Sequence, residues 1–191
     1  MFRLKIFLFK FKKIRIIFYW LFNYKLKFKD FLVLSKDSLF IDIGANIGNV
    51  TQYVDDKFKC NIICYEPNMA CFNFLKKRFK KKNNIKIYNC AISNETDNAK
   101  LFLHRRANKK EDLEYSEAGS LFDKKDNISK DNFVTVKTLD IKDLLNNFKK
   151  IELIKIDIEG WEYNILDELI KNKEKIKKIV CELHGNPNIR S

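Results

Sequence analysis

The sequence predicts an α/β fold built on a doubly wound parallel sheet. Short apolar runs typical of buried strands alternate along the chain with segments whose apolar residues recur at helical spacing. Several of these runs end at a carboxylate or a glycine, as strands do where they lead into tight turns. The length of 191 residues suits one domain with one sizeable core. These observations together favour an open sheet with helices on both faces.

The formal net charge of +13 is distributed unevenly along the chain. Residues 1–30 contain nine Lys or Arg and one acidic residue, a balance of +8, whereas the rest of the chain has a balance of +5. The basic excess therefore belongs mainly to the N-terminal segment, and we expect no specific nucleic-acid partner. Hydrophobic residues make up 46% of the chain, which excludes general disorder.

Residues 1–35 form a basic and aromatic segment that we expect to be helical. Its longest apolar run, Ile16–Phe22, is far shorter than the roughly 20 residues that span a bilayer. Two interpretations stay open: contact of residues 1–30 with an anionic membrane surface, or helices that cover the sheet. We therefore divide the chain into this segment and a domain of residues 36–191.

The cysteines indicate a reducing compartment. There are five, an odd number without a C-x-x-C pair, and the two histidines are far apart, so the spacing of a zinc site is absent. Most of the cysteines lie in apolar runs, where they usually act as small buried hydrophobic residues. We expect a cytoplasmic protein, with the N-terminal segment allowing a peripheral position at the inner face of the membrane.

The first predicted strand leads into a glycine turn and then a helix. Residues 39–43 are apolar apart from Asp42, the turn reads Gly-Ala-Asn-Ile-Gly, and helical spacing resumes at Val50. This order of elements holds nucleotide-type ligands, because glycines let the backbone approach and the helix N-terminus offers N–H groups. The candidate binding residues of this turn are Asp42, Gly44, Ala45, Asn46 and Gly48.

Two acids narrow the choice of ligand. The glycine spacing is G-x-x-x-G rather than the G-x-G-x-x-G of dinucleotide sites, and Asp42 is a poor neighbour for a pyrophosphate. The next apolar run, residues 61–65, leads to Glu66, which lies 22 residues beyond Gly44, near the position where an acid binds ribose hydroxyls. S-adenosylmethionine has a ribose, an amino-acid tail and a sulfonium, and it lacks phosphate. It fits this pattern better than NAD does.

Shorter elements are predicted between Glu66 and residue 150. Asn68 caps a helix whose apolar residues recur at 3–4 spacing. Residues 104–132 are polar and aperiodic, which indicates a functional loop or a disordered insert, and its one apolar part, residues 118–122, is suited to fold over a site. The other predictions are a strand at 85–88, a loop reached through 89–93, strands at 100–103 and 134–136, and a helix at 138–145.

Besides the glycine turn, residues 151–160 are a second group of candidate functional residues, and we call these two stretches the chemical centres of the sequence. The predicted strand ends in Asp157 and Glu159 before Gly160, and a helix follows. The last predicted strand, residues 176–182, also leads to polar residues. Acids at the ends of parallel strands project into the crevice where open α/β sheets bind ligands. The candidate catalytic residues are Asp157, Glu159, Glu182 and His184.

Three groups of sequence blocks in this order resemble the FkbM-type family of S-adenosylmethionine-dependent methyltransferases. The blocks are FIDIGANIGNVT, then YEPN with NCAISNET, then TLDIKDLL with LIKIDIEGWEYNIL. The resemblance covers about residues 38–184, and KIDIEGWE is its most specific part. It implies a Rossmann-like class I methyltransferase that O-methylates a sugar, a glycan or a hydroxylated natural product.

The resemblance also implies roles for individual residues. Glu66 would hold the ribose, and residues 42–48 the methionine end of the cofactor. The adenine would be flanked by Asn89, Ala91 and Ile92, and the transferred methyl would be faced by Asp157 and Glu159. Class I methyltransferases continue past the fifth strand with a sixth and a reversed seventh, whereas this sequence stops at Ser191. We therefore expect a short or truncated member that lacks the last β-hairpin and leaves a sheet edge exposed.

A hydroxyl acceptor must lose its proton as it attacks the methyl group. His184 is the candidate base, because imidazole titrates near neutral pH. Three acids, Asp157, Glu159 and Glu182, are expected to orient this base, to hold the acceptor, or jointly to bind a divalent cation.

Two other classes of function stay open. The first is an NAD-linked oxidoreductase on the same fold. A Y-x-x-x-K pattern is formed by Tyr53 and Lys57, but it directly follows the glycine turn, so we interpret it as chance. The second is a truncated, non-catalytic module that binds S-adenosylmethionine or nucleic acid. An enzyme that methylates nucleic-acid bases would carry a Pro-Pro-aromatic block where Ile158, Glu159 and Gly160 stand, and this block is absent.

Overall fold

The computed structural model describes residues 34–104, 107, 119–121 and 128–184. The predicted helical segment at 1–35 therefore lies outside the described residues except for its last two positions, and the membrane contact of residues 1–30 stays a prediction. Most of the predicted loop at 104–132 also lies outside them. No helix within the described ranges is long and apolar enough to cross a membrane.

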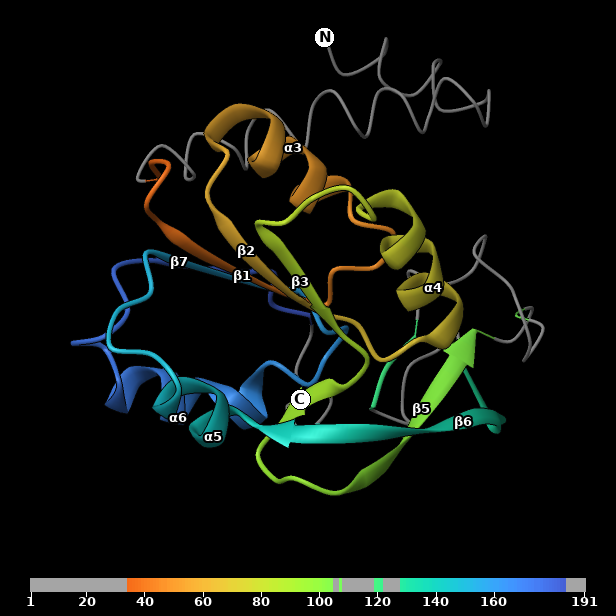
Figure 1. The fold of residues 1–191 in the computed structure, drawn as a ribbon. Helices are drawn as coiled ribbons and strands as arrows, with labels where there is room; N and C mark the ends of the chain where they lie inside the picture. Colours follow the sequence, from red (N-terminus) through yellow and green to blue (C-terminus); the bar gives the residue numbers. More distant parts are fainter. Residues whose placement is uncertain (1–33, 105–106, 108–118, 122–127, 185–191) are drawn as a thin grey trace, which may run out of the picture. The chain divides into compact units, whose positions relative to one another are not determined.

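Five parallel strands form the main sheet, in the order β3-β2-β1-β7-β8 (Figure 1). They are β1 (Leu39–Ile43), β2 (Asn61–Tyr65), β3 (Ile85–Tyr88), β7 (Leu153–Ile156) and β8 (Ile179–Cys181). The strand order reverses between β1 and β7, which are neighbours. Open α/β sheets bind ligands beyond the carboxyl ends of the strands at such a switch point. The predicted parallel sheet is confirmed, and its switch point lies at the carboxyl ends of β1 and β7, where the glycine turn and Asp157 follow.

Helices cover both faces of this sheet (Figure 1). On one side lie α3 (Asn49–Phe58) and α4 (Met69–Arg78), and on the other α5 (Ile141–Asn146) and α6 (Tyr163–Lys171). Asn68 caps α4 as predicted, because its side-chain oxygen accepts the N–H groups of Ala70 and Cys71. The fold is therefore doubly wound.

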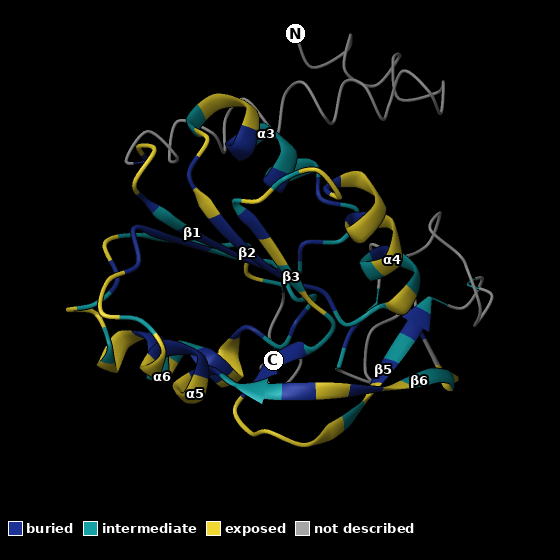
Figure 2. Ribbon diagram, viewed as in Figure 1, coloured by how far each residue is buried: buried dark blue, intermediate teal, exposed yellow. Residues whose placement is uncertain are grey.

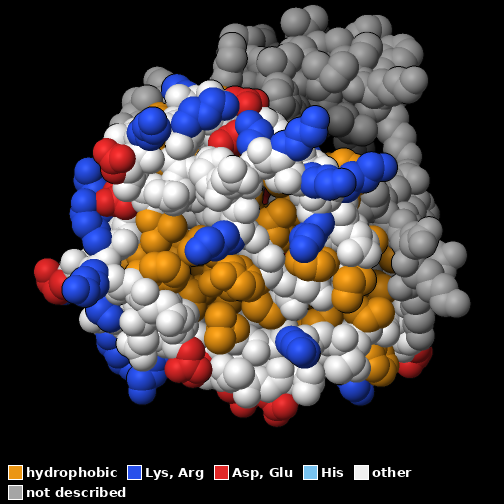
Figure 3. Space-filling view, in the orientation of Figure 1, with side chains coloured by type: hydrophobic (Ala, Val, Ile, Leu, Met, Phe, Trp, Pro, Cys, Tyr) orange, Lys and Arg blue, Asp and Glu red, His pale blue; other side chains and the backbone are white. Residues whose placement is uncertain are grey.

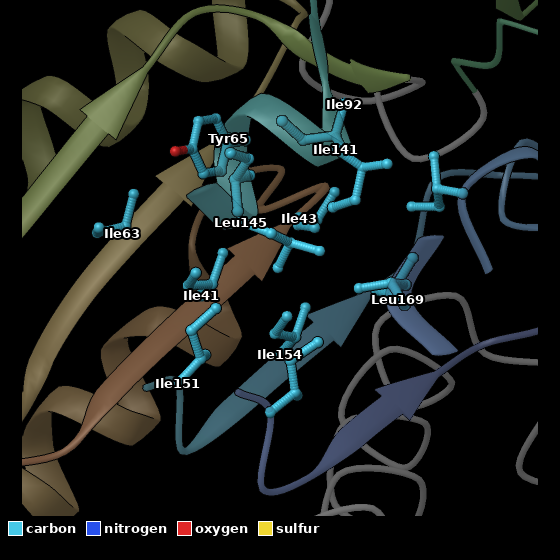
Figure 4. Packing of buried hydrophobic residues seen from close by; sticks show 14 residues of the cluster. Ile41, Ile43, Ile63, Tyr65, Ile92, Ile141, Leu145, Ile151, Ile154 and Leu169 are labelled. Atoms are coloured by element: carbon cyan, nitrogen blue, oxygen red, sulfur yellow. The ribbon is translucent and has the colours of Figure 1, made fainter. Parts of the chain in front are cut away.

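The main hydrophobic core lies between the sheet and the pair α5 and α6. Figure 4 shows Ile41 and Ile43 of β1 and Ile154 of β7 near Leu145 of α5 and Leu169 of α6, and all five side chains are fully buried. The strands of the sheet are largely buried, whereas the helices are exposed along their outer sides (Figure 2). Burial on both faces explains why the strands are nearly continuous apolar runs.

A second sheet of three strands follows β3 and was missed by the sequence analysis. Its strands are β4 (Ala91–Ser93), β5 (Asn98–His104) and β6 (Ile128–Asp140), in the order β4-β6-β5. Residues 89–93, predicted to lead to a loop, contain β4. The strand predicted at 100–103 is confirmed within β5, and the one predicted at 134–136 belongs to the 13-residue β6. The first half of β6 is mostly polar, so its strand structure depends on pairing with β5, as between Phe133 and Phe102.

The helix predicted at residues 138–145 begins later than expected. Thr138, Leu139 and Asp140 pair with β4 and so belong to β6. Asp140 then caps α5, because its side chain accepts the N–H of Lys142 at 2.8 Å. Tertiary pairing therefore sets the start of this helix.

The edge strand β3 carries an exposed aromatic residue. Tyr88 is 46% exposed and stacks on Tyr65 of β2 with 5.4 Å between the ring centroids. On the face drawn in Figure 3, hydrophobic side chains gather across the middle, and Lys and Arg side chains lie among and around them.

Candidate active site

The turn after β1 is packed against the end of β7. Gly44 has a φ of +76°, and a Cβ at this position would lie 2.0 Å from the carbonyl oxygen of Asp157. The N–H groups of Gly44 and Ala45 both donate to the carbonyl of Tyr65, at 3.0 and 3.2 Å. The turn therefore touches the ends of β2 and β7 at once, and only glycine fits its first position.

Gly48 allows helices α3 and α4 to pack close together. It precedes α3 with a φ of +78°, and a Cβ here would lie 2.5 Å from Leu75 Cδ2 and 2.7 Å from Phe79 Cε2. Both contacts are to side chains at α4 and its C-terminal end. The second glycine of the motif thus lets α3 begin close to α4, a packing role that the sequence analysis did not foresee. Between the glycines, Asn46 also has a positive φ, of 50°.

Asp42 is buried and paired with a lysine. It is fully inaccessible to solvent and accepts the hydroxyl of Thr51 at Oδ2, at 2.8 Å. Lys155 Nζ lies 3.3 Å from the other oxygen, Oδ1, which has no well-formed hydrogen bond, so this contact is an ion pair. Burial raises the pKa of Asp42 more than Lys155 and Thr51 lower it.

Lys155 joins the ends of β1 and β7. Besides Asp42, its Nζ donates to the carbonyl of Gly44 at 2.7 Å and lies 3.6 Å from Asp157 Oδ2. Burial lowers the pKa of Lys155, but the negative charges of Asp42 and Asp157 outweigh that effect, so its pKa is raised and it stays charged. The ammonium therefore fixes the glycine turn and two candidate site acids relative to one another.

Glu66 occupies the end of β2 as predicted. Its two carboxylate oxygens accept backbone N–H groups, from Asn46 at 2.7 Å and from Asn68 at 2.8 Å. Only 6% of the residue is exposed, and burial raises its pKa to about 7 in spite of these hydrogen bonds. Glu66 therefore ties the glycine turn to the start of α4.

The residues predicted at the adenine lie beyond β3. Asn89 donates from Nδ2 to the carbonyls of Glu66 and Pro67, at 2.9 and 3.0 Å, and so supports the Glu66 loop. Ala91 and Ile92 are buried, 6% and 1% exposed, and each packs in a hydrophobic cluster. Their contact with adenine stays a prediction.

Three of the four predicted catalytic residues come together after β7 and β8. One carboxylate oxygen each of Asp157 and Glu159 and one ring nitrogen of His184 lie within 4.8 Å of one another. Each side chain is partly buried, at 30%, 24% and 23% exposure. Glu182 is outside this group; its backbone N–H donates to the carbonyl of Ile156 at 2.9 Å.

His184 is oriented by a buried glutamate, Glu162. The two are joined by a 2.9 Å hydrogen bond between His184 Nδ1 and Glu162 Oε1, and Glu162 also accepts the N–H groups of Ile158 and Gly160. Burial raises the pKa of Glu162, but the bonds from His184 and Gly160 outweigh it and lower the pKa overall. A charged Glu162 therefore holds Nδ1–H toward itself, and Nε2 faces Glu159 Oε2 at 3.6 Å.

A model of the FkbM methyltransferase domain matches residues 42–190, more than three quarters of the chain. The chain belongs to the FkbM methyltransferase family. The resemblance found in the sequence is thereby confirmed, and the match spans both chemical centres. S-adenosylmethionine is the methyl donor that membership implies.

The chain is also similar to one curated protein and one solved structure. Methyltransferase 1 of Beauveria bassiana (strain ARSEF 2860) is 25% identical over 165 residues, covering 77% of this chain. The match spans 65% of the length of that relative. Among solved structures, P. horikoshii TYW2 in complex with MeSAdo matches 35% of this chain and 26% of its own, with a TM-score of 0.32 and 23% identity.

Two residues of the FkbM site escaped the sequence analysis. Lys155 had a visible signal, because it is a charged residue inside the apolar run of β7, two positions before Asp157. Its partner Asp42 is its direct neighbour in the β1–β7 register. Glu162 looks in sequence like any acid near a helix start. Its contact with His184 joins residues 22 positions apart, which only the fold reveals.

Proposed function

We propose that this chain transfers a methyl group from S-adenosylmethionine to a hydroxyl of a sugar, glycan or natural product. The observation that carries the proposal is the charge at the strand ends. Three acids meet one lysine there: Asp42 Oδ1 and Asp157 Oδ2 lie 3.3 and 3.6 Å from Lys155 Nζ, and Glu66 follows the neighbouring strand β2. A site with more acids than cations suits the sulfonium and ammonium groups of S-adenosylmethionine and disfavours the pyrophosphate of NAD.

The cofactor's ends are assigned to the two sides of the switch point. Glu66 accepts the ribose hydroxyls with lone pairs left over from its two backbone hydrogen bonds. Asp42 and the turn from Gly44 to Gly48 hold the methionine end, while Asn89, Ala91 and Ile92 flank the adenine. This arrangement directs the methyl group toward Asp157.

The acceptor belongs beside Asp157, Glu159 and His184. As the S–CH₃ bond breaks and the O–CH₃ bond forms, S-adenosylhomocysteine leaves and the hydroxyl gives up its proton. Holding the acceptor in line supplies most of the rate. The proton has two routes from this group of residues: to His184 Nε2 as general base, or to water when a cation acidifies the hydroxyl.

Glu66→Gln is expected to weaken the binding of S-adenosylhomocysteine by about 1–3 kcal/mol, because a charged hydrogen bond to the ribose is lost. The measurement is calorimetric titration of the purified chain. Glu174→Gln, which makes the same change at an exposed position, is the control and should bind as the unaltered chain does. Equal affinity of both variants would show that the ribose is held elsewhere.

Cofactor affinity is also expected to depend on pH through Glu66, whose pKa is about 7. Ribose hydroxyls donate to the ionised carboxylate, so binding favours that form and weakens as pH falls through 7. Affinity for S-adenosylhomocysteine should then drop by up to about tenfold per pH unit below 7. The profile of Glu66→Gln should lose this limb, and an unchanged profile would contradict the assignment.

The reaction itself is tested with S-adenosylmethionine labelled in its methyl group. We expect the label to appear on hydroxylated acceptors from a panel of sugars, glycans and natural products, and S-adenosylhomocysteine to bind where NAD does not. Binding of NAD alone would instead favour the oxidoreductase. The Y-x-x-x-K pattern does not favour that reading, because Lys57 Nζ donates to the Tyr53 hydroxyl at 3.3 Å as an exposed pair one turn apart on α3.

A further inference from the structure

We infer that Asp157, Glu159 and His184 form a binding site for one divalent metal cation. The inference rests on the proposed function, since the cation would bind the acceptor hydroxyl at the reacting end of the same site. Two carboxylate oxygens and one imidazole nitrogen, all within 4.8 Å of one another, have the spacing of ligands around one ion. The three residues follow two adjacent strands, β7 and β8, so the sheet holds them together.

The imidazole of His184 makes the hydrogen bond at its second ring nitrogen that metal-binding histidines usually make. Histidine ligands almost always donate their second ring N–H to a carboxylate or carbonyl, which fixes the tautomer. Here Nδ1 of His184 is bonded to Glu162, a residue with no exposed surface. The backbone carbonyl of His184 also accepts the Tyr163 hydroxyl at 3.0 Å. In the neutral ring the lone pair of Nε2 then points toward the side on which Glu159 lies, 3.6 Å away.

Residues around the proposed cation site also position Asp157 and Glu159. Lys155 lies 3.6 Å from Asp157 Oδ2 and ties it to the glycine turn. The carbonyl of Glu159 accepts the hydroxyl of Ser120, at 2.7 Å, and Ser120 is 1% exposed. Glu159 has a φ of +59°, a strained backbone conformation for a residue with a side chain. The surrounding contacts therefore maintain a costly geometry that directs this carboxylate toward His184.

The ligand set indicates the kind of ion and its use. Two carboxylates and one imidazole suit an ion of the Mn²⁺ or Mg²⁺ class, with borderline ions such as Zn²⁺ as competitors. Three protein ligands leave coordination positions for the acceptor oxygen and water. A hydroxyl bound there has a lowered pKa, so it loses its proton to water before it attacks the methyl group. His184 then acts as a ligand rather than as the base.

The alternative is an imidazolium held between Glu162 and Glu159 without a cation. Direct binding of Mn²⁺ separates the two arrangements. Mn²⁺ is titrated into the full chain, and the electron paramagnetic resonance signal of the free ion is followed, with Mg²⁺ and Zn²⁺ as competitors. We expect saturable binding of one ion per chain at sub-millimolar concentration. The inference is overturned if the chain shows no saturable binding of Mn²⁺ at millimolar concentrations of the ion.

Matched variants locate the ion. Asp157→Asn and Glu159→Gln each remove one ligand charge and should weaken Mn²⁺ binding at least about tenfold. Asp167→Asn makes the first change at an exposed position of α6 and should leave binding unaltered. Glu162→Gln keeps the three ligands and removes the negative charge that faces His184 Nδ1, so a loss of about 10- to 100-fold is expected. Binding that is equal in all four variants would refute the site.

Cofactor binding is measured on the same samples, so that the two proposals fail separately. Variants that lose Mn²⁺ but still bind S-adenosylhomocysteine are folded and support the cation site. A chain that binds S-adenosylhomocysteine and transfers methyl groups without any cation retains the proposed function and loses this inference. A chain that binds Mn²⁺ at these residues but no S-adenosylhomocysteine keeps the cation site, and the proposed function falls.

Discussion

Replacing Asp157 with alanine is expected to lower the rate of methyl transfer by about a thousandfold, as the loss of a preorganised charged group at a reacting centre does. Asp157 is the acid of the site that both follows β7 directly and contacts Lys155, at 3.6 Å. It also belongs to the group with Glu159 and His184. The change therefore removes a charge from the reacting end and leaves Glu66, on the ribose side, in place.

The measurement separates catalysis from binding. The turnover of labelled S-adenosylmethionine should fall. The affinity for S-adenosylhomocysteine should stay within about threefold, because the change leaves the charged hydrogen bond to the ribose, of about 1.5–3 kcal/mol, in place. Asp167→Ala, an equal change at an exposed site, is the control for stability and charge. Full activity of Asp157→Ala would remove the residue from the mechanism. A parallel loss of activity and cofactor affinity would make it a binding residue.

Gly44→Ala is expected to destabilise the domain by more than about 4 kcal/mol, a value reached only where atoms collide or backbone strain is severe. The new Cβ would lie 2.0 Å from the Asp157 carbonyl oxygen and 3.0 Å from its carbonyl carbon. The backbone of Asp157 is held at this place, because its N–H donates to the carbonyl of Ile43 in β1 at 3.1 Å. The φ of +76° adds the strain of a left-handed conformation.

Gly160→Ala is the matched comparison for this prediction. Gly160 has a φ of +109°, but a Cβ there meets no atom within 4 Å, so only backbone strain of about 1–3 kcal/mol is expected. Denaturant unfolding of both variants measures the difference between them. Equal destabilisation would show that the contact with β7 relaxes easily and that strain alone explains the need for glycine.

The second sheet shows where reasoning from the sequence stops. Apolar alternation in residues 134–136 marked the part of β6 that packs in a hydrophobic cluster, which includes Val136. The polar stretch from Ser129 to Asn132 has no such pattern, and it continues β6 between two residues that pair with β5, Ile128 with His104 and Phe133 with Phe102. Long-range pairing of this kind overrides local propensity and leaves little trace in the sequence.

By itself, the sequence determined the parallel sheet, the glycine turn and the positions of the acids Asp42, Glu66 and Asp157. These features are local: an apolar run makes a buried strand that here includes Asp42, a glycine makes the turn, and residues that follow a strand, such as Glu66 and Asp157, lie at the carboxyl edge of the sheet. Tertiary structure alone decided which of the polar residues meet. The contacts of Lys155 with Gly44 and of Glu162 with His184 join residues 111 and 22 positions apart. Such contacts depend on strand order and register, because neighbouring strands of a parallel sheet come from distant parts of the chain.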